Sequence, residues 1–208
     1  IILIWAHYIC KMHQKSLLET SSRYPYEVII SIFLLLLIAF DSYSQRQTQN
    51  WYFGRNAGLS FVATPPTSLL DGALNTFEGC ATFSDNQGNL LFYTDGMNVF
   101  DKNHQRMPNG SGLMGNPSSA QSGIIVPNSS SPSKFYVFTV DAEGGGNGLR
   151  YSEVDLSLNG GTGDVIVATK NTPLFTPAEE KIAAVRHPSI PGAFWVIAHG
   201  FNNNRFYS

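Results

Sequence analysis

The sequence has little cysteine, little charge and no long amphipathic helix pattern. Of its two cysteines, only Cys80 follows the apolar run at residues 28–40, so an internal disulfide is excluded after that run. We interpret Cys80, at the start of a strand pattern, as a small buried hydrophobe. Charged residues make up 13% of the chain and the net charge is −2. Bulk electrostatics therefore favour neither nucleic acid nor an anionic membrane surface as a partner.

Motifs that carry chemistry are also missing. Residues 110–115 match G-x-G-x-x-G, but no strand pattern precedes them and no helix pattern follows, so we predict an ordinary loop. His104, His187 and His199 lack the paired spacing of metal ligands. No G-x-S-x-G, P-loop or EF-hand pattern occurs. We therefore predict no catalytic residue, no metal site and no cofactor, and expect that the protein is not an enzyme.

The N-terminal part has the organisation of an export signal. Basic residues precede the 13-residue apolar run, and small residues follow it at Ser42 and Ser44. We predict a signal peptide over residues 12–44, cleaved between Ser44 and Gln45, after an upstream or unstructured segment at residues 1–11. A single membrane anchor is the alternative, although the run is shorter than the roughly 20 residues that span a bilayer. The mature segment is expected to be secreted and free of membrane.

What the sequence does contain is a repeated strand pattern. Residues 80–96, 123–142 and 181–200 each have a short apolar strand, a turn rich in Pro, Ser, Asn or Gly, and an aromatic strand. All 19 glycines follow the apolar run, and turn residues recur every 8 to 12 positions. This spacing is typical of all-β proteins. One or two short strands are predicted within residues 50–61, and further strands at residues 80–84, 90–94, 98–101, 122–126, 135–140, 149–156, 182–186, 194–199 and 206–207.

The repeats predict a partial β-propeller over residues 45–208. Successive residues of the aromatic strand at 135–140 are apolar on both faces, as expected for a strand between two neighbouring sheets. Radially stacked blades bury their strands in this way. We predict about three antiparallel blades of a larger, seven-bladed propeller, with Trp195 buried between two of them. A β-sandwich is the alternative, but it gives no reason for a repeated pattern.

Three polar residues occupy matching places at the ends of the aromatic strands: Asp95, Asp141 and His199. In a propeller these positions would meet at one rim, where a ring of polar groups could contact a ligand. The alternative is that the aspartates cap the turns that follow them. His104 and His187 lie in turns and are expected to be solvated.

Several short stretches of the chain form a recognisable set: NWYFG at residues 50–54, DGALNT at 71–76, EGCATFSD at 78–85, GNLLFYTDG at 88–96, MPNG at 107–110, and the strands at 148–155 and 180–187. In these stretches the chain resembles a family of large bacterial surface proteins, often described as gliding-motility-associated. The family has an N-terminal propeller and a C-terminal sorting domain for the type IX secretion system. The resemblance therefore implies export to the cell surface, and remaining blades and a sorting domain within the same polypeptide.

Together these features predict a non-catalytic cell-surface propeller that acts as a binding or adhesion scaffold for a protein or glycan, with a link to gliding or surface attachment. Two rival functions remain open. A propeller hydrolase of glycosidase type would need clustered carboxylates in a central pocket. The sensor propeller of a signalling receptor would need a transmembrane helix downstream.

Overall fold

The computed structural model describes residues 43–208, with side chains from Arg46 onward. The predicted upstream segment and nearly all of the predicted signal peptide therefore lie outside the described residues. The described chain begins with a 3-10 helix, η1 (Tyr43–Thr48), which contains the predicted cleavage site at Ser44 and Gln45. From there to the C-terminus the structure is all-β, with only two further 3-10 turns, η2 (Asn159–Gly161) and η3 (Val167–Thr169).

The strands form four antiparallel sheets, and none of them closes on itself. The first sheet contains β1 (Asn50–Phe53), β2 (Ala57–Ser60) and β3 (Thr67–Leu69). The second contains β4 (Ala81–Ser84), β5 (Leu90–Thr94), β6 (Asn98–Asp101) and β7 (Arg106–Ser111). The third contains β8 (Gly123–Pro127), β9 (Lys134–Val140), β10 (Leu149–Asp155) and β11 (Asp164–Val165), with β12 (Thr172–Phe175) paired to β10. The fourth contains β13 (Ala178–Arg186), β14 (Phe194–Gly200) and β15 (Phe206–Tyr207).

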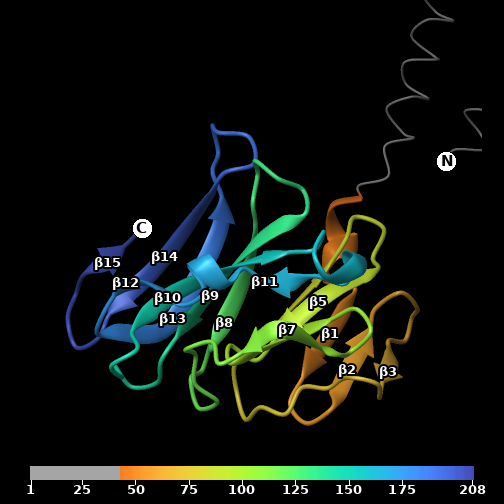
Figure 1. Cartoon of the computed structure of the whole chain (residues 1–208), viewed down its shortest axis with the longest axis horizontal. Helices are drawn as coiled ribbons and strands as arrows, with labels where there is room; N and C mark the ends of the chain where they lie inside the picture. The colour runs from red at the N-terminus through yellow and green to blue at the C-terminus, as the bar shows by residue number, and fades with distance from the viewer. Residues whose placement is uncertain (1–42) are drawn as a thin grey trace, which may run out of the picture. The chain divides into compact units, whose positions relative to one another are not determined.

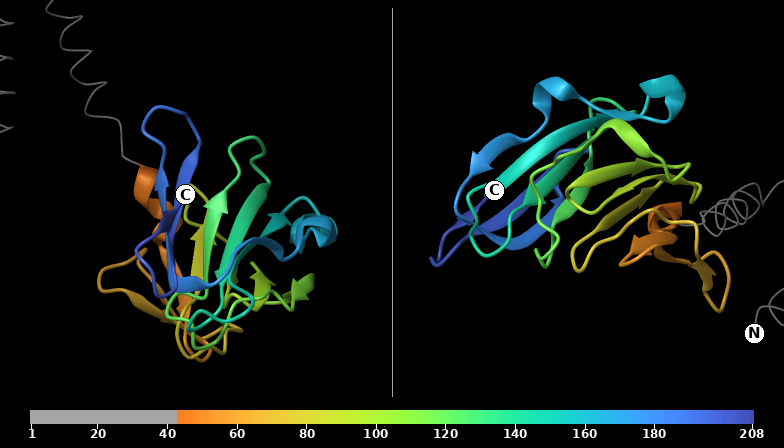
Figure 2. Two further views of the ribbon diagram at one scale, coloured as in Figure 1. Left: turned by 90° about the vertical axis from the view of Figure 1, so that its left-hand side faces the viewer. Right: turned by 60° about the horizontal axis from the view of Figure 1, so that its bottom comes forward.

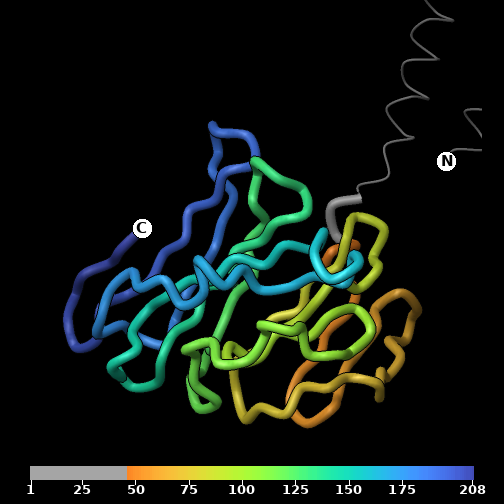
Figure 3. Tube along the Cα trace, in the orientation of Figure 1, coloured from red at the N-terminus to blue at the C-terminus, as the bar shows by residue number. Residues whose placement is uncertain are grey.

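The four sheets follow one another in chain order. Figure 1 shows the first sheet in orange at one side and the fourth in blue at the other, and the views in Figure 2 agree. The first strand of each sheet packs against the first strand of the next: β1 against β4, β4 against β8, and β8 against β13. The Cα trace in Figure 3 shows the same progression from orange to blue. Adjacent sheets therefore meet along their first strands, and we call this line of first strands the inner edge.

A separate apolar core fills each of the three spaces between adjacent sheets. Tyr52, Leu74 and Tyr93 form the core between the first and second sheets. Phe92, Val99, Met107, Leu113, Phe135, Val137, Val154 and Val165 form the core between the second and third. Val140, Leu149, Ala178, Ile182 and Ala198 form the core between the third and fourth. Because successive side chains of a strand point to opposite faces, Phe92 and Tyr93 of β5 enter two different cores.

The outer edges of the second and third sheets are tied together by polar side chains. Strand β11 belongs to the third sheet, yet its Asp164 accepts hydrogen bonds from the main-chain and side-chain nitrogens of Asn109 in β7, at 2.8 and 2.7 Å. Lys170 donates to the carbonyl oxygen of Asn109 at 3.0 Å and also to that of Ser111. These contacts complement the packing of the first strands at the inner edge.

Glycines allow the second and third sheets to approach closely at the inner edge. A Cβ atom on Gly79 would lie 2.1 Å from the main-chain nitrogen of Ser122, and one on Gly96 would lie 2.6 Å from the carbonyl oxygen of Ser122. Gly96 itself has a φ of +82°. Any larger side chain at these positions would push the two sheets apart.

The aromatic strands lie where the sequence predicts them, but two features differ from the predictions. Residues 50–69 form a sheet of their own, so four sheets are present where about three blades were predicted. Trp195 is not covered by the described residues, and 43% of its surface is exposed. On β14, Phe194, Val196 and Ala198 alternate with Trp195 and Ile197, and only the first set faces the third sheet. The other set lies on a face that no described sheet covers.

Candidate functional site

Asp95 and Asp141 are both used to hold turns. Asp95 is 2% exposed, and its Oδ1 accepts hydrogen bonds from the main-chain nitrogens of Met97 and Asn98, at 2.8 and 2.6 Å. Asp141 accepts from the main-chain nitrogens of Ala142 and Asn147, at 2.9 and 3.1 Å. Buried carboxylates that accept several N–H bonds stabilise the local turn. These contacts match the capping alternative for both residues.

The segment 115–122 links the two aspartates, while His199 is not part of this network. Gly115 donates a main-chain hydrogen bond to Gly96, next to Asp95, and Asn116 donates its side-chain amide to Asp141 at 3.0 Å. His199 lies instead on β14, where its ring is 4.7 Å from that of Phe206. The three positions therefore do not form a single polar ring through contacts among the described residues.

Glu180 joins β13 to two distant loops, a role that the sequence does not indicate. Its two carboxylate oxygens accept hydrogen bonds from the main-chain nitrogens of Ala120, at 2.7 Å, and Glu143, at 2.8 Å. The side-chain oxygen of Gln121 accepts a further hydrogen bond from the Ile182 nitrogen at 3.2 Å. The carboxylate thus holds β13 to two loops that precede it by 37 and 60 positions. No local pattern could have revealed contacts at such a separation.

A second polar network lies between the first and second sheets. The Tyr52 hydroxyl donates to Asp71 Oδ1 at 2.9 Å, and His104 Nε2 lies 3.3 Å from Asp71 Oδ2. The Tyr93 hydroxyl lies 3.0 Å from His104 Nδ1 and accepts a hydrogen bond from the Ala73 nitrogen at 3.0 Å. The expectation that His104 is solvated was therefore wrong, because its side chain is only 21% exposed.

Burial favours the neutral forms of two tyrosines and one cysteine in this region. Burial, followed by the hydrogen bond to Asp71, raises the pKa of Tyr52 well above its ordinary value. Burial also raises the pKa of Tyr93. The free thiol of Cys80 is half-buried against the same core, and burial followed by the charge of Asp95 raises its pKa. A protonated, half-buried thiol is a poor nucleophile, in agreement with its interpretation as a small hydrophobe.

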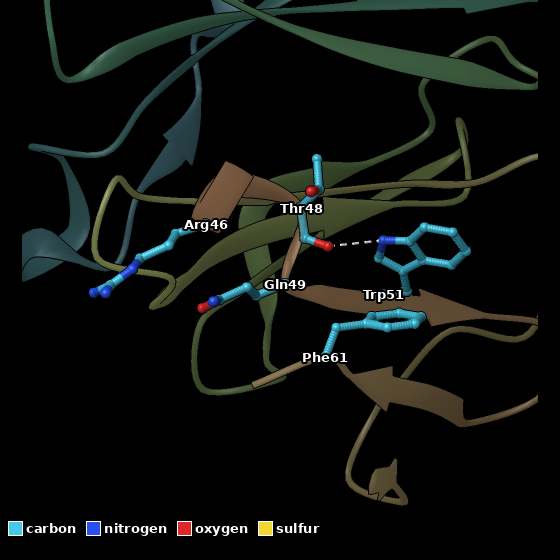
Figure 4. Close-up of a pocket in the computed structure, with 5 residues that line it drawn as sticks. All are labelled: Arg46, Thr48, Gln49, Trp51 and Phe61. Carbon is cyan, nitrogen blue, oxygen red and sulfur yellow. Dashed lines mark hydrogen bonds between the residues drawn. The ribbon is translucent and has the colours of Figure 1, made fainter. Parts of the chain in front are cut away.

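A shallow aromatic pocket lies on the outer face of the first sheet. It has a volume of about 320 Å³ and is lined by Arg46, Thr48, Gln49, Trp51 and Phe61. Figure 4 shows the Trp51 and Phe61 rings side by side, with the Trp51 indole nitrogen donating to the Thr48 carbonyl oxygen at 2.9 Å. The two ring centres are 4.9 Å apart, and 51% of the Trp51 surface is exposed.

A second cavity, of about 220 Å³, lies between the third and fourth sheets. We call it the inter-sheet cavity. Residues of β8 and β9 form one wall and residues of β14 the other, and the loops at residues 128–130 and 192–193 form its rim. Unlike the aromatic pocket, it is bounded by two sheets that are both present in the structure.

Among the residues that the structure describes, no three His, Cys, Asp or Glu side chains come together as a metal-binding group. No helix in this part of the chain is both long and apolar enough to cross a membrane.

Comparisons with known proteins leave the family open. No protein-family model matches the chain, and no curated protein or solved structure matches it either.

Proposed function

We propose that residues 45–208 are the N-terminal part of a β-propeller that acts, without catalysis, as a binding scaffold on the bacterial cell surface. The observation that carries this proposal is the packing of the first strands, β1 against β4, β4 against β8, and β8 against β13. Radial stacking of antiparallel sheets around an axis brings first strands together in this order. In a sandwich, two large sheets would instead face each other over one core.

The exposed apolar faces of the first and fourth sheets support a larger propeller. Val185, Trp195, Ile197 and Phe206 are exposed on the outer face of the fourth sheet, and Trp51, Phe53 and Phe61 on that of the first. Exposed apolar faces of this kind are typical of surfaces that pack against another partner. We infer that further sheets of the same polypeptide cover both faces. On this interpretation the Trp51 pocket is packing surface, and ligands bind elsewhere.

The use of the carboxylates supports a non-catalytic role. General acid–base chemistry needs carboxyl groups with access to substrate. Asp95, Asp141 and Glu180 instead accept hydrogen bonds from main-chain nitrogens of the loops that they hold. The predicted signal peptide and the resemblance to type IX-exported proteins support location at the cell surface, where a scaffold of this kind would contribute to attachment or gliding.

Tryptophan fluorescence tests the architecture. In the exported protein, the difference between the spectra of the unaltered protein and of Trp195→Phe gives the emission of Trp195. We expect this emission to be blue-shifted and poorly quenched by acrylamide, because a further sheet would cover the side chain. Trp51→Phe should give the same result at the opposite face. Red-shifted, strongly quenched emission at both positions would mean that the four sheets stand alone, and the propeller proposal would be wrong.

Intact-cell labelling tests the function. An antibody against the folded protein should label unbroken cells, and deletion of the gene should reduce their attachment to surfaces or their gliding. Complementation with the unaltered gene should restore both. If the antibody labels only broken cells, or if attachment and gliding are unchanged by the deletion, the scaffold function is wrong.

A further inference from the structure

The inter-sheet cavity has two opposed apolar walls. Tyr136 and Phe138 of β9 line it on one side, and Phe194 and Val196 of β14 on the other. The guanidinium carbon of Arg186 lies 5.7 Å from the centre of the Phe194 ring, a cation–π contact that helps to fix the position of this ring. Aromatic side chains thus form the main surfaces that a ligand in the cavity would meet.

The rim of the cavity is polar and uncharged. Asn128, Ser129 and Ser130 line it, and no Asp, Glu, Lys, Arg or His is among the described residues that do so. The Ser129 and Ser130 hydroxyls make no hydrogen bond within residues 46–208. The loops meet where a Cβ on Gly192 would lie 2.6 Å from that of Ser129, so this glycine sets the width of the rim.

The Tyr136 hydroxyl is prepared to act as a donor. It accepts a hydrogen bond from the Asn128 side-chain amide at 3.1 Å, while the Asn128 side-chain oxygen accepts from the Ser130 nitrogen at 2.9 Å. Burial, followed by the charge of Glu153 and by Tyr151, raises the pKa of Tyr136, so the hydroxyl keeps its hydrogen. That hydrogen is available to an oxygen atom of a ligand.

We propose that the inter-sheet cavity binds one pyranose ring of a neutral glycan. A sugar ring combines an apolar C–H face with hydroxyl groups around its edge. The C–H face matches the aromatic walls, and the sugar hydroxyl groups match the hydroxyl groups of Ser129, Ser130 and Tyr136. The uncharged lining gives no partner for a carboxylate or phosphate group. A volume of about 220 Å³ is below the 300 to 1,000 Å³ of pockets for drug-sized ligands, which favours one ring over several. This proposal rests on the proposed scaffold function and names its ligand class.

Calorimetry and saturation-transfer NMR with the exported protein test this assignment. The probes are maltotetraose, cellotetraose, mannotetraose and chitotetraose, with tetragalacturonate as the charged probe and decaproline as the peptide probe. At least one neutral tetrasaccharide should bind saturably, with transfer concentrated on the protons of one ring. Tetragalacturonate and decaproline should not bind.

Three variants locate the binding. Phe194→Ala should weaken it at least about tenfold, because one aromatic wall is lost. Tyr136→Phe keeps the ring and the fold but removes the donor, and should weaken it about two- to tenfold. Phe77→Ala is the matched control. The Arg55 guanidinium carbon lies 5.6 Å from the centre of the Phe77 ring, a contact like that of Phe194 with Arg186, but Phe77 does not line the cavity. This control should leave the affinity unchanged.

Several results would overturn the proposal. One is the absence of saturable binding by all four neutral probes at millimolar concentration, and another is binding that both cavity variants leave unchanged. Saturable binding of decaproline in place of the sugars would reassign the cavity to a peptide. None of these results bears on the fluorescence and cell-labelling tests, so the scaffold proposal stands or falls separately.

Discussion

The Tyr93 hydroxyl lies 3.0 Å from His104 Nδ1, between the first and second sheets. This hydroxyl also accepts a hydrogen bond from the Ala73 nitrogen at 3.0 Å. On its other side the His104 ring places Nε2 3.3 Å from Asp71 Oδ2. Together these contacts hold the loop around Asp71 against the second sheet.

Removal of the Tyr93 hydroxyl should destabilise the protein. Tyr93→Phe leaves both the Ala73 N–H and His104 Nδ1 without a partner at a fully buried position, so we expect a loss of about 1 to 3 kcal/mol in the free energy of unfolding. Urea titration of the exported protein and of the variant measures this loss in the free energy of unfolding. Tyr151→Phe is the control, because the Tyr151 hydroxyl makes no hydrogen bond within the described residues. Equal effects of the two variants would contradict the network.

The close approach at Gly79 predicts a strong effect of a single methyl group. In Gly79→Ala the new Cβ would overlap the main chain at Ser122, so we expect a loss of about 2 to 3 kcal/mol or failure to fold. Gly146→Ala is the matched control, since nothing lies within 4 Å of a Cβ there. That variant should change thermal stability by less than about 1 kcal/mol. If Gly79→Ala were equally mild, the first strands would not meet as described.

Asp155 makes stability depend on pH in the acid range. The Ser157 hydroxyl, which donates to Asp155 Oδ1 at 2.6 Å, is the main reason why the pKa of this carboxyl is lowered. A lowered folded-state pKa stabilises the protein above the ordinary Asp value of about 3.9, and this contribution is lost as pH falls through the folded-state pKa. Ser157→Ala should therefore cost about 1 kcal/mol at pH 7 and much less near pH 2.

Denaturant titrations at both pH values measure this difference. Ser118→Ala serves as the control, because its exposed hydroxyl makes no hydrogen bond in the part of the chain that is described, and its effect should be small at both pH values. A cost of Ser157→Ala that is the same at pH 7 and pH 2 would show that the hydroxyl does not act through the carboxylate.

Export predicts a defined N-terminus. We expect mass spectrometry of the exported protein to find Gln45 as the first residue, because small residues at Ser42 and Ser44 follow the apolar run. Ser44→Pro should block processing, whereas Gln45→Glu should permit it. A mature protein that retains residues 28–40 would support the membrane-anchor alternative.

The sequence predicts the inner strands of the sheets well and the outer strands poorly. The aromatic strand β9 has apolar residues on both faces, and these enter the cores on either side of the third sheet. Strand β7 contains Pro108, Asn109 and Gly110, which are typical of turns, and it forms because an edge strand needs hydrogen bonds on one side only. The two-residue strand β11 has no detectable pattern, since its pairing depends on β10.

In the candidate sites, contacts between residues close in sequence could be predicted, and contacts between distant residues could not. Capping by Asp95 and Asp141 could be predicted, because their partners lie within six positions along the chain. The burial of His104 could not, because its partner Asp71 lies on a separate loop. Nor could the inter-sheet cavity, whose walls come from β8, β9 and β14. The exposure of Trp195 depends on what covers the fourth sheet, which no local pattern describes.

The outer tie between Asn109 and Asp164 has a mechanical consequence. The second and third sheets are joined at their inner edge by first-strand packing and at their outer edge by Asp164 and Lys170. Two attachment lines on opposite edges prevent one sheet from rotating against the other. A force transmitted along the chain must therefore break both lines to separate these two sheets, and they should resist it as one rigid body.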